Sequence, residues 1–208
     1  MQLQYLMETG EKENVYKVYD KIAAWFSENR DTVLMEKNYL DDVIALLPPH
    51  ATVLDLGCGT GNPILKYLIG KGLNITGVDA STCMLAIARA NFPLTEFILQ
   101  DMRLLALNKK FDAIIAWHSF FHLPAAHQPA MFHRFEQHIN PNGILLFTSG
   151  TLHGEVWGMN GGENLFHASL ATVEYENLLK QHHFKVLKHN VSDADCGNAT
   201  VWMAKYIG

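Results

Sequence analysis

The pattern that most restricts the fold begins at residue 51, where short β-rich runs alternate with helical patterns along the chain. Such alternation is typical of parallel strands joined by crossover helices. Uninterrupted apolar stretches such as 113–116 favour strands that are covered on both faces. We therefore expect strands over 51–56, 74–79, 96–100, 111–117, 143–148, 183–189 and 199–206, and helices over 63–70, 82–91, 125–139 and 168–182.

Only the short segment 190–198 joins the last two expected strands, which favours an antiparallel pair. Two further helices, over 14–28 and 32–47, are expected before the first strand. No linker-like stretch divides the 208 residues, so we expect a single domain with an N-terminal helical cap (1–50) and a core (51–208). The predicted fold is α/β: a doubly wound, seven-stranded, mostly parallel sheet with an antiparallel last strand, preceded by N-terminal helices.

Composition argues against several classes of partner. The formal charge of −5 gives no surplus of basic residues for a phosphate backbone, so we expect no nucleic-acid partner. The acidic N-terminal region is unlike a signal peptide and no long apolar run occurs, so we expect a cytoplasmic protein without a membrane partner. Three distant cysteines indicate neither a disulfide framework nor a zinc site. The oligomeric state stays open.

The most informative stretch is the segment 53–63, VLDLGCGTGNP, in which an apolar strand runs into three glycines and then a helix. Glycines allow positive φ and close approach of a ligand to the backbone. In open α/β sheets, ligands bind at the carboxyl ends of strands where the strand order reverses. We therefore expect Gly57, Gly59 and Gly61 to border a ligand site.

Acidic residues end the first three expected strands or follow directly after them. Asp79 comes 24 residues after Asp55, close to the spacing at which an acid accepts the hydroxyl protons of a ribose. Asp101 would accept from the amino group of an adenine, and the amide of Met102 would donate to its ring. The third glycine comes one residue earlier than in the GxGxxG dinucleotide pattern, which argues against a nicotinamide cofactor.

These motifs resemble those of the class I S-adenosylmethionine-dependent methyltransferases of the compact, small-molecule type, over roughly residues 15 to 206. VLDLGCGTGNP resembles the first motif of that family, GVDAS the second and Gln100-Asp101-Met102 the third. FDAII (111–115) and PNGIL (141–145) resemble the fourth motif and the turn into the fifth strand. The resemblance implies a Rossmann-like fold and S-adenosyl-L-methionine as the cofactor.

Carried over by position, the resemblance implies a role for each of these residues. Gly57 and Gly59 would lie against the methionine part of the cofactor, with Asp55 near its amino group. Asp79 would hold the ribose, and Asp101 would accept from the adenine amine. Further residues expected around the adenine are Val78, Ala80 and Met102.

Two positions qualify the resemblance. The family places an aromatic residue of the N-terminal helix over the cofactor, and Tyr19, in the segment YKVYD, is the candidate. Its spacing with Val15, Ile22 and Phe26 fits a packing stripe equally well. Near the end, the chain has His183-Phe184 where the family usually has Gly-Phe, so the glycine that ends the preceding helix is missing.

The fourth strand ends in Trp117-His118, which the predicted topology places beside the transferred methyl group, with Trp117 against the cofactor. His118 is the candidate general base, since an imidazole can accept a proton at neutral pH; a hydrogen-bonded structural role is the alternative. His118 and His122 are four residues apart, but we expect no metal site there. His122 is instead a candidate substrate contact.

The stretch 148–164 is polar, rich in glycine and long, as functional loops often are. Its candidate substrate contacts are His153, Glu155 and Trp157, although an ordinary surface loop fits as well.

The predicted function is transfer of a methyl group from S-adenosyl-L-methionine to an O, N or S atom of a small molecule by in-line displacement. The alternatives are an NAD(P)-dependent oxidoreductase and a non-catalytic S-adenosylmethionine-binding regulatory protein.

Overall fold

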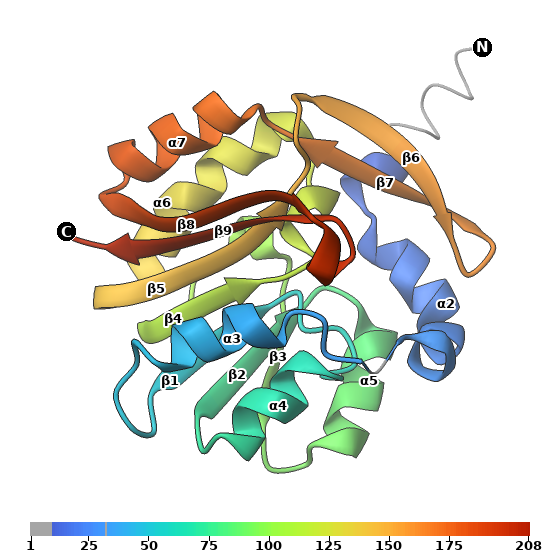
Figure 1. Cartoon of the computed structure of the whole chain (residues 1–208). Helices are drawn as coiled ribbons and strands as arrows, with labels where there is room; N and C mark the ends of the chain where they lie inside the picture. The colour runs from blue at the N-terminus through green and yellow to red at the C-terminus, as the bar shows by residue number, and fades with distance from the viewer. Residues whose placement is uncertain (1–9, 32) are drawn as a thin grey trace.

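The computed structural model describes residues 10–31 and 33–208, so the first residues of the expected cap (1–9) and the expected helix start at residue 32 lie outside it. Its main sheet has seven strands in the order β3-β2-β1-β4-β5-β9-β8 (Figure 1). The strands are β1 Thr52–Leu56, β2 Asn74–Asp79, β3 Glu96–Leu99, β4 Phe111–Ala116, β5 Ile139–Ser149, β8 Phe184–Asp193 and β9 Ala199–Tyr206. The predicted doubly wound α/β fold is confirmed.

The pairing of the strands gives their directions. β1 pairs in parallel with β2 and β4, β2 with β3, and β4 with β5. β9 runs antiparallel to both β5 and β8, so the antiparallel last strand lies inside the sheet, between β5 and the edge strand β8. The strand order of the sheet reverses between β1 and β4. Open α/β sheets bind their ligands at such a reversal.

Helices cover both faces of the sheet, as the apolar strands require. They are α2 Tyr16–Asn29, α3 Lys37–Ile44, α4 Ile64–Gly70, α5 Thr82–Asn91, α6 Gln128–His138 and α7 Thr172–Gln181. The apolar core on one face includes side chains of α6 and α7, and the core on the other includes side chains of α3, α4 and α5. In β4, Ile114 faces the first core and Ile115 the second, both fully buried. No helix of the described ranges is long and apolar enough to cross a membrane.

The prediction that residues 148–164 form a loop is wrong. Residues Gly154–Asn160 (β6) and Glu163–Ser169 (β7) form an antiparallel hairpin that lies next to α2 (Figure 1), and helix α7 starts at Thr172 rather than at 168. Gly161 and Gly162 form its turn with φ of 57° and 83°. Two positive φ values in succession are what a two-residue type I′ hairpin turn requires. Leu165 and Phe166 of β7 are buried in the core, which holds the hairpin against the sheet.

Candidate active site

A cavity of about 320 Å³ opens at the carboxyl ends of β1, β2, β3 and β4, at the reversal of strand order. Its volume is within the usual range for a small-molecule site. Of the residues that the sequence placed at a cofactor site, it is lined by Tyr19, Asp55, Gly57, Gly59, Gly61, Val78, Asp79, Ala80, Asp101, Met102 and Trp117. The candidate base His118 and the candidate substrate contact His122 line the same cavity.

The glycine turn forms one wall of this cavity. Gly57, Gly59 and Gly61 have φ of 80°, 53° and 78°, which side-chain-bearing residues rarely adopt. A Cβ on Gly57 would lie 2.2 Å from Cβ of Ser119, whereas a Cβ on Gly59 would meet nothing within 4 Å. Ser119 is fixed because its hydroxyl donates to the carbonyl of Leu56 over 2.6 Å. The turn is therefore packed tightly behind Gly57 and open at Gly59.

Asp79 ties the second strand to the glycine turn. Its Oδ2 accepts from the amide of Gly59 and its Oδ1 from the amide of Ser81, each over 2.8 Å. Burial raises the pKa of Asp79, and the backbone amides that donate to it offset part of the increase. Asp79 lines the cavity, and because a carboxylate oxygen can accept more than one hydrogen bond, a ribose diol can also donate to it.

Asp55 lies at the base of the cavity with an exposed fraction of 4%. Within the described residues, its carboxylate has no hydrogen-bond donor, and burial together with the charge of Asp79 raises its pKa to about 7. A buried carboxylate without a donor is costly unless a ligand cation pairs with it. This position fits a ligand that carries an ammonium group.

The carboxylate of Asp101, which follows β3, is held by Arg103, a residue that the sequence analysis did not identify. Nε and Nη2 of Arg103 donate to the Asp101 carboxylate, and Nη1 of Arg103 donates to Glu13 over 2.7 Å. Burial alone would raise the pKa of Asp101, but the hydrogen bonds from Arg103 lower it. The ion pair of Arg103 with Glu13 ties the N-terminal segment to this side of the cavity.

Tyr19 reaches the cavity because α2 is fixed at its neighbour Asp20. The Asp20 carboxylate accepts from the hydroxyl of Ser81 over 2.7 Å and from the amide of Cys83 over 3.0 Å, at the start of α5. The Tyr19 side chain lines the cavity and also packs against the core, as the packing stripe predicts; a place over the cofactor stays a prediction.

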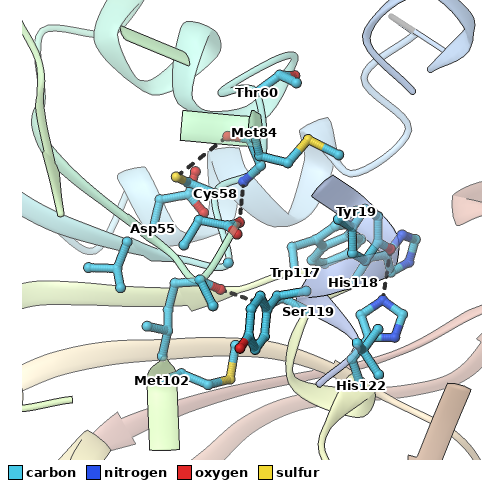
Figure 2. Close-up of a pocket in the computed structure, with 18 of the residues that line it drawn as sticks. Tyr19, Asp55, Cys58, Thr60, Met84, Met102, Trp117, His118, Ser119 and His122 are labelled. Carbon is cyan, nitrogen blue, oxygen red and sulfur yellow. Dashed lines mark hydrogen bonds between the residues drawn. The ribbon is translucent and has the colours of Figure 1, made fainter. Parts of the chain in front are cut away.

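Tyr19 and His122 form a hydrogen-bonded pair on the opposite side of the cavity from Asp55 and Met102 in the view of Figure 2. Nδ1 of His122 lies 2.8 Å from the carbonyl of Phe166 and must carry the proton, because a carbonyl only accepts. Nε2 therefore accepts from the Tyr19 hydroxyl over 2.9 Å. Burial lowers the pKa of His122 to about 3, so the ring is neutral.

His118 follows β4 with a φ of 48°, and its amide donates to the Thr148 hydroxyl over 2.9 Å. Its imidazole lies between the rings of Trp117 and Phe121, at centroid distances of 5.4 and 5.6 Å. Burial, and next the positive charge of Arg30, lower the pKa of His118 to about 4. The ring is therefore neutral at pH 7, with a lone pair available to a ligand.

The structure does not bring His153, Glu155 and Trp157 to the cavity. His153 lies 2.8 Å from the Glu174 carboxylate, Glu155 pairs with Lys12, and the Trp157 ring packs on Phe166. The expectation that they contact substrate rested on a loop, and in the hairpin these exposed positions lie outside the cavity lining. The hairpin instead contributes Asn160, Leu165 and His167, which the sequence analysis did not identify.

Comparison with known proteins agrees with this geometry. Residues 53–143 match the family described as "Methyltransferase domain". The chain is 26% identical over 185 residues to the "Putative methyltransferase 235L" of Invertebrate iridescent virus 6; this alignment covers 85% of the chain and 62% of the viral protein, less than two thirds of its length.

Two solved structures share the fold. One is SAM-bound CalS10, an amino pentose methyltransferase from Micromonospora echinaspora, with a TM-score of 0.70, 18% identity, and coverage of 88% of this chain and 94% of that one. The other is the 1,6-didemethyltoxoflavin-N1-methyltransferase of Burkholderia thailandensis, with a TM-score of 0.69, 18% identity, and coverage of 92% and 88%. Residues 53–143 thus match a methyltransferase-domain model, and the chain as a whole shares the fold of these two methyltransferases.

Proposed function

We propose that this protein transfers a methyl group from S-adenosyl-L-methionine to an O, N or S atom of a small molecule. The observation that carries the proposal is that the glycine turn, the acids after three adjacent strands and a group of neutral histidines line one cavity. When bound, the cofactor supplies a methyl group on a sulfonium, which is already an excellent leaving group. The protein then has to position the acceptor and exclude water, which supplies much of the rate enhancement.

The cofactor side of the cavity fits an adenosyl amino acid residue by residue. The unpaired Asp55 carboxylate suits the ammonium of the methionine part, and the open face at Gly59 lets that part approach the backbone. We assign Asp79 to the ribose hydroxyls, and Asp101 and Met102 to the adenine. The hydrogen bonds from Arg103 lower the pKa of Asp101 and favour its ionised form.

We expect the affinity for S-adenosylhomocysteine to fall about tenfold between pH 8 and pH 6. The pKa of Asp55 is about 7 in the free protein, and an ammonium beside it would lower that pKa in the complex. Ligand binding is therefore favoured above pH 7 and weakens as Asp55 takes up a proton below it. Isothermal titration calorimetry at the two pH values measures the change.

The Asp55→Asn variant is the matched control for this pH dependence. It should bind more weakly than the unmodified protein at pH 8, with an affinity that no longer changes between pH 6 and pH 8. Equal affinities of the unmodified protein at both pH values would contradict the assignment of Asp55 to the ammonium.

The acceptor side of the cavity lacks an unpaired acid. Its polar side chains include His118, His122 and His167, and burial lowers the pKa of each. A base with a pKa of about 4 cannot deprotonate an alkylammonium, but it can take the proton of a hydroxyl, which becomes strongly acidic as the oxygen is methylated. We therefore favour an acceptor that is uncharged before attack, such as a phenol or a heteroaromatic N–H, over an aliphatic amine.

The relatives support a small-molecule acceptor but do not indicate a particular one. The two structural neighbours are named for an amino pentose and for 1,6-didemethyltoxoflavin, both small molecules. Our proposal includes a single domain and a cytoplasmic location, as the sequence predicts.

Two measurements test the proposed function. Calorimetry should show S-adenosylhomocysteine binding and no comparable binding of NADH, whereas the reverse result would favour the oxidoreductase alternative. A transfer assay with methyl-labelled S-adenosylmethionine over a panel of phenols, heteroaromatics and amines should then label an acceptor of the first two classes. Binding without transfer to any panel member would favour the regulatory alternative.

A further inference from the structure

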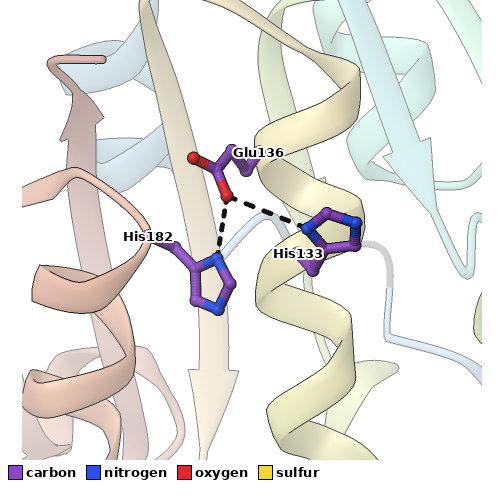
Figure 3. Close-up of side chains that lie close together, drawn as sticks. All are labelled: His133, Glu136 and His182. Atoms are coloured by element: carbon purple, nitrogen blue, oxygen red, sulfur yellow. Dashed lines mark hydrogen bonds and ion pairs between the residues drawn. The ribbon is translucent and has the colours of Figure 1, made fainter.

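A second group of ionisable side chains lies outside the cavity, where α6 meets the end of α7. His133 and Glu136 are three residues apart on α6, and His182 and His183 directly follow α7. Figure 3 shows three of these side chains pointing toward one another from the two helices. The ligand atoms of His133, Glu136 and His182 all lie within 4.8 Å of one another.

The distances centre on the Glu136 carboxylate. Its Oε2 lies 2.9 Å from Nδ1 of His182 and 4.0 Å from Nδ1 of His133, and its Oε1 lies 3.9 Å from Nε2 of His183. The two longer separations exceed hydrogen-bond distance. They are about 0.6–0.7 Å longer than the separation of about 3.3 Å that ligand atoms have around a tetrahedral Zn²⁺ with bonds of about 2.0–2.1 Å.

His183 occupies a backbone conformation that a glycine would favour. Its φ is 61°, directly after the residue that ends α7, at the position where the related family usually has glycine. Its carbonyl accepts from the amide of Ile207 over 2.8 Å, which fixes this backbone. Histidine is one of the residue types that adopt this left-handed conformation more readily than most. The His183 ring comes within 3.9 Å of Glu136, beside the group.

The surroundings suit metal ligands. The His182 ring stacks on Phe132 at a centroid distance of 6.4 Å, which fixes its orientation. Nε2 of His133 lies 2.9 Å from the side-chain amide of Gln137. When Nδ1 of a histidine binds a metal, its other nitrogen donates to a neighbouring acceptor, and the amide oxygen of Gln137 provides one once the amide is turned over. His133 and His183 are exposed, so an ion can enter from solvent.

We propose that His133, Glu136 and His182 bind one Zn²⁺ ion that ties the end of α6 to the end of α7, with a water molecule as the fourth ligand. Two imidazoles and one carboxylate form a donor set that zinc uses. Rotation of the exposed His133 ring can shorten its 4.0 Å separation from Glu136 to the ligand spacing of a tetrahedral site. The proposal does not depend on the function of the cavity.

The test is titration of chelator-treated full-length protein with ZnCl₂, followed by calorimetry. We expect one strong site per chain, and a rise in Tm of about 5–10 °C when Zn²⁺ is at about one hundred times its Kd. His133→Gln removes an exposed ligand and should lower the affinity at least about 100-fold, because losing even an outer partner of a ligand costs about 10- to 100-fold. The rise in Tm should disappear with it.

Two further variants make the result decisive. His182→Gln should weaken Zn²⁺ binding about as much as His133→Gln does, since it removes the second imidazole ligand. His153→Gln is the matched control, because His153 contacts Glu174 over 2.8 Å without belonging to the group, and its Zn²⁺ affinity should be unchanged. Strong binding that survives His133→Gln and His182→Gln, or no strong site in the unmodified protein, would overturn the proposal.

Discussion

Replacing Asp79 with alanine should weaken the binding of S-adenosylhomocysteine at least about 100-fold. In the proposed complex the carboxylate accepts from two ribose hydroxyls, and each hydrogen bond to a charged group contributes about 1.5–3 kcal/mol. A loss of about 3 kcal/mol or more corresponds to at least about 100-fold in Kd. The same substitution leaves the amides of Gly59 and Ser81 without their acceptor, so the glycine turn loses its tie to β2.

Calorimetry measures this loss, with circular dichroism to establish that the variant is folded. Asp195→Ala removes the same charge at an exposed position outside the cavity and should leave the Kd unchanged. Retention of full affinity by a folded Asp79→Ala protein would show that the ligand does not lie at the carboxyl end of β2.

Replacing His118 with alanine should lower kcat about 10²- to 10⁴-fold, the usual contribution of a general base. The affinity for S-adenosylhomocysteine should change by less than about threefold, because a group that acts on the acceptor contributes to the transition state rather than to cofactor binding. Turnover of the acceptor found in the labelling panel measures the first quantity and calorimetry the second. Unchanged turnover would remove His118 from the mechanism.

The protonation state of His118 can be measured independently of any acceptor. Its pKa of about 4 means that the ring should stay neutral when the pH is lowered from 8 to 5. An NMR titration of the histidine side chains follows this directly, and His118→Ala assigns the signal. A pKa near the ordinary value of about 6.5 would mean that the ring is solvated rather than buried between Trp117 and Phe121.

The cofactor side of the cavity could be predicted because its information is local in the sequence. The segment 53–63 contains the strand, the turn and the helix start together, and Asp79 and Asp101 come at the ends of strands that the apolar runs delimit. Once the strands are parallel and adjacent, their carboxyl ends meet at one edge. The residues around Gly57 could therefore be identified from the sequence without knowledge of any long-range contact.

His118 and His122 on the acceptor side were predicted, but the residues that the hairpin adds there were not, because the composition of the hairpin resembles that of a loop. The glycines and polar residues of 148–164 were interpreted as a loop, although Gly161-Gly162 between two chain segments is itself a hairpin signal. The role of His167 depends on the register of that hairpin. The pairing of Arg103 with Glu13 joins residues ninety positions apart, and no pattern in the sequence indicates it.

The hairpin has a consequence for how this protein can change its specificity. The groups assigned to the cofactor come from 55–102, Trp117 and Tyr19, whereas Asn160, Leu165 and His167 reach the cavity from the separate hairpin between β5 and α7. Substitutions in the hairpin can change the shape of the side of the cavity assigned to the acceptor, while the side assigned to the cofactor stays unchanged. Selection for a new acceptor would therefore act on the residues of this hairpin.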